Sequence, residues 1–401
     1  MIKSRSPLFL WLQCLWLSMF LAACGGGAAG SGSSGTGSSG GGTTVSVPGV
    51  GSGGTGMSFG PLTGFGSIVV NDVHYNIDGI TPAIEDAAEL KLGMVVHVVG
   101  GATAAGGTVT ATSVSTAAEL RGAVDAIDRA AGTFEVLGMT VSTDSATIDD
   151  GLVSLGTLAV GQFVQASGLP LGSSGLRATK IETVAAPAEL ITTGPIANLN
   201  VSAGTFSVGA TPVNFAAAAL QGLGRSELAN GLIVRVRGQR AGGLLVATKV
   251  QRWQDAVADN TALSSGGVIS GYSSLSSLFD VSGVAVNAAN AAVTGGQVAT
   301  LGNGVKVDVE GTLVNGVLQA TRVKIRHVPG DGKLPAFSAE GRIVQFVSPA
   351  SFRVKGQKID ASQPGVVFIN GTAASLAQNV QVSVTGTRVV GDVLIASEVR
   401  F

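Results

Sequence analysis

Apolar and polar residues alternate in short runs along residues 58–401, and the same arrangement of runs returns five times. Each copy begins with two apolar residues two positions apart, then a turn, then another apolar residue. Residues two apart lie on one face of a strand, and a Gly or an Asn-Asp pair between two such runs indicates a hairpin. We therefore predict one β-hairpin in each copy, at Ile68–Tyr75, Phe134–Val141, Phe206–Val213, Phe279–Val286 and Phe352–Ile359.

A second shared pattern follows each hairpin. It consists of Leu-x-x-Gly, an alternating strand that ends in Gly, a loop, and a strand that carries Ala-Thr. We expect a helical turn or tight loop in which the Leu fills the core and the Gly turns the chain into the next strand. The copies open at Leu90/Gly93, Leu158/Gly161, Leu228/Gly231, Leu301/Gly304 and Leu376/Asn379, and close at Ala111-Thr112, Ala178-Thr179, Ala247-Thr248, Ala320-Thr321 and Ala396-Ser397. Because each alanine follows the first apolar residue of its hairpin by 41 to 44 residues, the pattern is an internal repeat.

These patterns predict an all-β protein of five tandem small β-barrel modules. Each module has room for about five or six short strands, and closing them into a barrel removes the exposed edges of an isolated sheet. We place the modules at residues 58–117, 118–187, 188–255, 265–328 and 337–401. The joints fall near 185–188, 254–265 and 328–336, whereas the first two modules have almost no spacer between them.

The segment before the modules has the pattern of a secretory signal. Lys3 and Arg5 are followed by an apolar run to Phe20 and then by small residues, so we predict a signal peptide over residues 1–23. The tetrad Leu21-Ala22-Ala23-Cys24 resembles a bacterial lipoprotein lipobox. The resemblance implies that Cys24 is diacylated (a palmitate-type modification) and becomes the new N-terminus. An ordinary signal peptide and a single membrane-spanning anchor are the alternatives.

By the same resemblance, the residue after the cysteine bears on where the protein is sorted. Gly25 is not the aspartate that retains such lipoproteins in the inner membrane, so an outer-membrane location is expected. Residues 24–57 would then connect the lipid to the first module. This stretch is rich in Gly and Ser, with 15 Gly among residues 25–56, and such a chain buries too little apolar surface to order itself.

One segment of the first repeat carries a resemblance to a known family. Gly64-Phe65-Gly66-Ser67-Ile68-Val69-Val70-Asn71, followed by Leu90-x-x-Gly93, is similar to the repeat of a bacterial family called domain of unknown function 5666. The resemblance covers residues 58–401 and implies small barrels like the oligonucleotide/oligosaccharide-binding (OB) type. Since the shared motifs are structural, it implies no catalytic residue.

Composition and charge narrow the classes of function. Charged residues make up 12% of the 401 residues, against about 25% in an average soluble domain. The net charge is −1, and it becomes −3 when Lys3 and Arg5 leave with the signal peptide. A nucleic-acid-binding protein normally carries a basic face, so we expect no nucleic-acid partner. The cysteines are Cys14 and Cys24, which leaves no thiol for a disulfide after processing.

Few residues are candidates for catalysis or metal binding. His74 and His97 lie on predicted strands of one module, but without a cysteine or the usual spacing they favour two solvent-facing histidines over a metal site. The acidic pairs Glu85-Asp86 and Asp149-Asp150, with Asp144 and Asp331, are typical of solvated turns more than of acid–base or calcium chemistry. His327 has no predicted partner. We therefore predict no catalytic residue, no metal site and no cofactor.

Aromatic side chains would mark a face that stacks sugars or bases. The repeated residues Phe134, Phe206, Phe279 and Phe352 are better explained by core packing. Tyr272, Trp253 and Phe346 are the aromatic residues that we expect to be exposed, and they are too scattered to form a strip.

Together these observations favour a lipid-anchored envelope protein whose modules act as a non-enzymatic binding or structural array. Envelope proteins or glycans are the expected partners. A carbohydrate-binding or carbohydrate-active envelope protein is the alternative.

Overall fold

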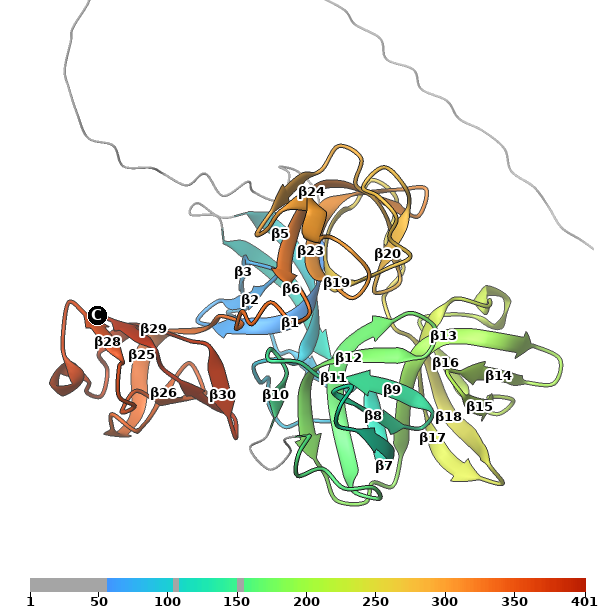
Figure 1. Ribbon diagram of the computed structural model, residues 1–401, viewed down its shortest axis with the longest axis horizontal. Helices are drawn as coiled ribbons and strands as arrows, with labels where there is room; N and C mark the ends of the chain where they lie inside the picture. Colours follow the sequence, from blue (N-terminus) through green and yellow to red (C-terminus); the bar gives the residue numbers. More distant parts are fainter. Residues whose placement is uncertain (1–55, 104–107, 150–154) are drawn as a thin grey trace, which may run out of the picture. The chain divides into compact units, whose positions relative to one another are not determined.

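The computed structural model describes residues 56–103, 108–149 and 155–401, all of which fall in one compact unit. Nearly all regular structure in these residues is β-strand, so the predicted all-β class is confirmed. Figure 1 shows the five groups of strands in sequence colours.

Each repeat forms one module of strands. Module 1 contains β1 (Met57–Phe65), β2 (Ile68–Val70), β3 (Val73–Asn76), β4 (Ala83–Ile84), β5 (Val95–Thr103) and β6 (Val109–Thr116). Module 2 contains β7 (Leu120–Asp128), β8 (Thr133–Val136), β9 (Met139–Ser142), β10 (Ile148–Asp149), β11 (Phe163–Leu171) and β12 (Gly175–Thr183). Module 3 contains β13 (Leu190–Asn200), β14 (Thr205–Val208), β15 (Thr211–Asn214), β16 (Ala219–Gln221), the 3₁₀ turn η1 (Arg225–Glu227), β17 (Ile233–Ala241) and β18 (Leu244–Arg252).

The last two modules follow the same order. Module 4 contains β19 (Ala262–Ser270), β20 (Phe279–Val281), β21 (Val284–Asn287), β22 (Ala292–Thr294), η2 (Val298–Thr300), β23 (Lys306–Val314) and β24 (Val317–His327). Module 5 contains β25 (Phe337–Ser348), β26 (Ser351–Val354), β27 (Gln357–Asp360), β28 (Val367–Ile369), η3 (Ala373–Ser375), β29 (Gln381–Gly386), β30 (Arg388–Val390), β31 (Val393–Ile395) and β32 (Glu398–Arg400). The first strand of module 4 begins at Ala262, inside the joint expected at residues 254–265.

Strand pairing closes each module into a small barrel. In module 3 the order is β13-β14-β15-β18-β17 and back to β13, and all pairs are antiparallel except β15 with β18, which is parallel. The short strand β16 runs parallel to the second half of β18. The same ring closes in the other modules, although module 5 divides its last two strands into β29/β30 and β31/β32. This five-stranded ring is the arrangement that an OB-like barrel requires.

The Ala-Thr signature and the glycine of the preceding strand meet across one β-bulge. The strand was expected to end at this glycine, but in modules 1 to 4 it continues for three residues beyond it. In module 3, Gly238 pairs with Ala247 at a register shift, and a Cβ on Gly238 would lie 2.2 Å from the carbonyl oxygen of Val246. Only glycine tolerates so close an approach of the neighbouring backbone. The threonine hydroxyl then donates to the carbonyl just before the glycine, as Thr248 does to Arg237 at 3.1 Å.

The same hydroxyl bond recurs in every copy. The other donors and acceptors are Thr112 to Val99, Thr179 to Ser167, Thr321 to Glu310 and Ser397 to Thr385, at 3.1–3.2 Å. The departure at Ser397 therefore preserves the interaction, because serine carries the same hydroxyl.

The glycine of Leu-x-x-Gly supplies a left-handed turn, as the sequence predicted. Gly231 has φ 90°, and its N–H donates to the carbonyl of Ile196 at 2.8 Å, which ties the turn to the first strand of the module. Asn379 occupies the same conformation with φ 69°, because asparagine adopts this region more readily than other non-glycine residues. A 3₁₀ turn precedes the leucine in modules 3, 4 and 5.

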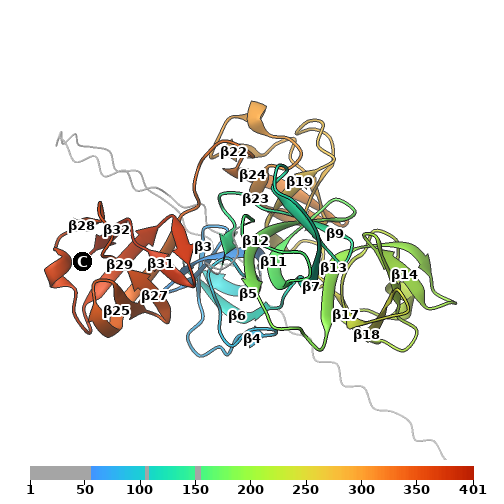
Figure 2. The same ribbon diagram turned by 60° about the horizontal axis from the view of Figure 1, so that its bottom comes forward.

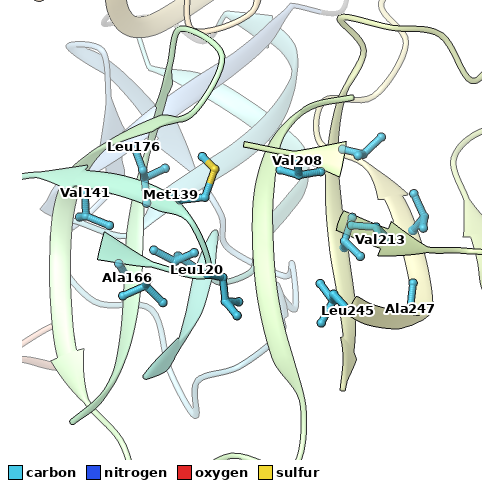
Figure 3. Packing of buried hydrophobic residues seen from close by; sticks show 14 of the residues in the cluster. Leu120, Met139, Val141, Ala166, Leu176, Val208, Val213, Leu245 and Ala247 are labelled. Atoms are coloured by element: carbon cyan, nitrogen blue, oxygen red, sulfur yellow. The ribbon is translucent and has the colours of Figure 1, made fainter. Parts of the chain in front are cut away.

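The repeated aromatic residues belong to the barrel cores. Phe134, Phe206, Phe279 and Phe352 are each at most 4% exposed, so core packing, not a ligand platform, is confirmed for them. The cores of modules 2 and 3 are continuous, and Met139 on β9 belongs to this shared cluster with Val208 on β14 (Figure 3). The hairpin turns of these two modules also touch, since the Thr211 hydroxyl donates to the carbonyl of Leu137.

Modules also join through their strands. β1 pairs in parallel with β19 at Met57–Phe59 and with β25 at Gly64 and Phe65, so module 1 contacts modules 4 and 5 through one strand. β7 pairs with β13, and β10 pairs with β30 at a single position. Figure 2 shows β7, β13, β19 and β25 from a second direction.

Candidate functional site

The residues that all five modules share make backbone turns, bulges and cores, so a functional site has to come from residues that differ between modules. Charged side chains of this kind gather where modules meet. Three such junctions stand out in the part of the chain that the structure describes, and module 1 contributes to each of them.

The first junction is built on Asp86, which follows the short strand β4. Its carboxylate accepts bonds from Arg121 of module 2 at 2.8 Å and from Arg237 of module 3 at 2.9 and 2.5 Å. The side chain of Asp86 is 7% exposed, so the prediction of a solvated turn residue is wrong for Asp86. Burial opposes ionisation, but Arg237 and then Arg121 outweigh it and hold the pKa of Asp86 below its ordinary value. The neighbouring Glu85 is 41% exposed and pairs with Arg237 and Lys249.

A buried acid lies beside this junction. Glu119 is fully buried and accepts bonds from Arg235 of module 3 at 3.0 Å and from the backbone N–H of Gly168 at 3.1 Å. Burial raises the pKa of Glu119 to about 7, against the opposing pull of the Arg235 guanidinium.

His97 and Trp253 lie in the same region. The His97 ring stacks on Phe59 with centroids 6.0 Å apart and meets the Trp253 ring edge-on at 5.6 Å. The Nε2 atom of His97 is inaccessible to solvent. The pKa of His97 is lowered to about 3, mainly by burial and to a smaller extent by the positive charge of Arg235. The prediction that His97 faces solvent is therefore wrong. Trp253 is 3% exposed, so the prediction that it is exposed is also wrong, while Tyr272 and Phe346 are half-buried against module cores.

The second junction joins modules 1, 2 and 5. Asp392 lies 2.8 Å from the ammonium groups of both Lys91 and Lys180, and Glu182 lies 2.7 Å from Lys91. The Lys180 side chain is only 2% exposed. Burial opposes ionisation here too, but Lys180 and Lys91 hold the pKa of Asp392 below its ordinary value.

The third junction, between modules 1 and 4, encloses a cavity of about 310 Å³. We call it the Lys306 cavity. Arg326 bridges two carboxylates of this cavity: the Arg326 guanidinium lies 2.6 Å from Asp72 and also binds Asp308. Lys324 pairs with Asp72 as well. The remaining polar lining comes from Asn71, Lys306, His327 and Lys333, and the apolar lining includes Pro61, Ile325, Leu334 and Pro335.

Two cations of the Lys306 cavity make no direct ion pair with a described residue. Within the described residues, neither the half-buried Lys306 ammonium nor the exposed Lys333 ammonium makes a hydrogen bond or an ion pair. Burial lowers the pKa of Lys306, although Asp308 and Asp144 oppose this from a distance. Asp308 is itself buried, and burial raises its pKa despite the bond to Arg326.

Of the remaining candidates from the sequence, Asp144 and Asp331 meet at His327, whereas His74 and Asp149 lie elsewhere. His74 is exposed and bonds to Ser67 at 3.0 Å, away from the buried His97. Asp144 pairs with Arg177 at 3.0 Å and approaches His327 at 3.4 Å, and so forms part of the wall beside the Lys306 cavity. Asp331 approaches the other ring nitrogen of His327 at 3.5 Å, whereas Asp149 lies on β10. Among the described residues, no three His, Cys, Asp or Glu side chains are grouped to hold a metal ion.

The predicted signal peptide over residues 1–23, Cys24, residues 25–55 of the predicted Gly/Ser-rich segment and Asp150 lie outside the described residues. The residues that are described contain no helix of the length and apolar character needed to cross a membrane.

The fold and the junctions define a class first: an all-β protein of tandem repeats, in which the positions shared by the five copies shape the backbone. A family comparison then identifies the repeat. The family described as "Domain of unknown function (DUF5666)" matches residues 60–115, 121–182, 193–251, 266–324 and 340–400, so the chain belongs to this family with five copies of its domain. No curated protein matches the chain.

Proposed function

We propose that the protein is a lipid-anchored component of the bacterial cell envelope. Its five modules would serve there as one non-enzymatic scaffold that binds an envelope partner or ligand. The observation that carries the scaffold role is the interlocking of the modules. β1 pairs in parallel with β19 of module 4 and with β25 of module 5. Asp86 of module 1 forms buried ion pairs with arginines of modules 2 and 3.

The repeat signature supports a non-enzymatic role for the repeats themselves. The shared Gly, Leu and Ala-Thr positions form turns, cores and bulges, so the repeat signature supplies no catalytic side chain. The lipid anchor is inferred from the lipobox that ends at Cys24. The Gly/Ser-rich segment after Cys24 would act as a flexible linker that lets the modules extend away from the membrane.

The anchor is tested by labelling growing Gram-negative cells with a clickable palmitate analogue and floating their membranes. The wild-type chain should carry the label and float with the outer membrane. Cys24→Ser should carry no label and should not float, because no other cysteine remains after the signal segment. Cys14→Ser is the matched control and should behave as wild type. Label on Cys24→Ser, or equal flotation of the two proteins, would contradict lipid anchoring at this position.

A further inference from the structure

We propose that the Lys306 cavity binds a small hydroxylated organic anion, the chemical class of sugar acids and sugar phosphates. The inference deepens the binding role proposed above, but it stands on the cavity between modules 1 and 4 and not on the lipid anchor. Its volume of about 310 Å³ is at the lower end of the range for small-molecule sites, which is about 300–1,000 Å³.

The charged side chains around the cavity favour an anionic ligand. Arg326 is occupied by Asp72 and Asp308, and Lys324 by Asp72, so these four groups compensate one another. Lys306 and Lys333 remain without a partner. A desolvated ammonium group is costly unless it is paired, and a carboxylate or phosphate between the two lysines would supply the pair.

Buried polar atoms in the same cavity also lack partners. Asn71 is 3% exposed, and its amide nitrogen donates to the carbonyl of Phe59 at 2.9 Å, but its Oδ1 atom accepts nothing. His327 is 5% exposed, and its Nε2 atom has no hydrogen bond. His327 Nε2 lies 3.4 Å from the Asp144 carboxylate, and neither it nor Asn71 Oδ1 is accessible to solvent, so the contacts to a ligand have to come from the more exposed groups of the lining.

The position of Asn71 shows why the acceptor is held there. Asn71 lies in the turn between β2 and β3 with φ 53°, where Gly60 and Gly266 on two neighbouring strands leave room for its side chain. A Cβ on either glycine would lie 2.4 Å from Asn71 Oδ1. This enclosure closes the oxygen off from the cavity, so a hydroxyl group of the ligand would donate instead to the Asp72 carboxylate, which lines the cavity and is 41% exposed, while the acidic group meets the lysines.

The remaining wall suits the carbon skeleton of such a ligand. Ile325, Leu334 and Pro335 provide apolar contact, and Leu334 is 56% exposed in the segment that connects modules 4 and 5. The absence of an aromatic residue from this lining favours recognition by charge and hydroxyl groups over ring stacking.

The test is isothermal titration calorimetry of the full chain in detergent with four probes: glucuronate, glucose 1-phosphate, neutral glucose and acetate. We expect glucuronate, glucose 1-phosphate or both to bind, and glucose to bind at least roughly tenfold more weakly because it cannot pair with the lysines. Acetate should also bind more weakly, because it has no hydroxyl for Asp72. Raising the salt concentration should weaken the binding of the charged probes.

Two variants assign the binding to this cavity. Lys306→Met keeps the length of the side chain and should weaken binding by roughly tenfold or more, and Lys333→Met, in an exposed segment, should weaken it several-fold without disturbing the fold. Lys358→Met on exposed β27 is the matched control and should leave binding unchanged.

Three outcomes would overturn the proposal. They are equal binding of glucose and glucuronate, binding that survives both Lys306→Met and Lys333→Met, and no heat from any probe at roughly 10 mM. A preference between glucuronate and glucose 1-phosphate would instead identify the acidic group. The Cys24→Ser protein should bind the probes like wild type, so a failure of lipid anchoring is distinguishable from a failure of this site.

Discussion

Glu119→Gln gives a sharp test of the electrostatics at the junction of modules 1, 2 and 3. The Glu119 carboxyl is fully buried between Arg235 and the N–H of Gly168, and burial raises its pKa from 4.5 to about 7. The folded protein therefore binds this proton more tightly than the unfolded chain does. Stability from this group is complete below about pH 4.5 and is lost as the pH rises through about 7.

The magnitude follows from these two values. Each pH unit between them contributes about 1.4 kcal/mol, so the wild-type protein should lose about 3 kcal/mol relative to Glu119→Gln between pH 4.5 and pH 8. His97 acts in the opposite direction, because its pKa is lowered to about 3 and stability is lost as the pH falls below about 6.5. Both proteins contain His97, so its contribution cancels when the two free energies of unfolding are subtracted.

The assay is urea unfolding at pH 5, 6, 7 and 8, followed by the fluorescence of buried Trp253 and by circular dichroism. The difference in unfolding free energy between wild type and Glu119→Gln should change steadily from pH 5 to about pH 7 and level off toward pH 8. The exposed Glu340→Gln variant is the control and should follow the wild-type profile. Parallel profiles for wild type and Glu119→Gln would refute the reasoning, because they would mean that Glu119 has the same proton affinity in both states.

Three further variants test other features. Asp86→Ala should destabilise the protein by about 3 kcal/mol, because it leaves Arg121 without its carboxylate and leaves Arg237 with only the more exposed Glu85 and Glu189; exposed Asp78→Ala should be nearly neutral in the same urea assay. Gly238→Ala should cost more than about 2 kcal/mol and lower the thermal midpoint, because its Cβ meets the Val246 carbonyl, whereas Gly302→Ala, with open space around it, should change the midpoint little. Lys306→Met should keep or raise the thermal midpoint without ligand, since it removes an unpaired, partly desolvated charge; a loss of more than about 1 kcal/mol would indicate a structural role for Lys306.

The local parts of the fold could be predicted from the sequence because their signals lie within a few residues. The hairpin from Phe206 to Val213 depends on apolar residues two apart and a turn between them, and the Gly231 turn depends on one residue type. The role of Ala-Thr could not be predicted in this way. Its hydroxyl bond and the facing glycine belong to different strands, and only their register brings them together.

The junctions could not be predicted because their partners are far apart in the chain. Asp86 looks like a solvated turn acid beside Glu85, and its arginines follow 35 and 151 residues later. The sequence predicts an exposed Trp253 after the last strand of module 3, but Trp253 packs against Phe59 and His97 of module 1. Charged residues make up only 12% of the chain, and this low share is the one signal in the sequence that many of them form structural ion pairs.

The double pairing of β1 also has a kinetic consequence. Module 1 is synthesised first, yet the edges of β1 are covered by residues 263–265 and 338–339, about 200 to 275 positions later in the chain. Contacts of such long range form slowly, and an uncovered strand edge recruits other chains until its own partner arrives. Module 1 therefore remains the most aggregation-prone part of the nascent chain until modules 4 and 5 have emerged, and a chain that stops before them keeps that edge open.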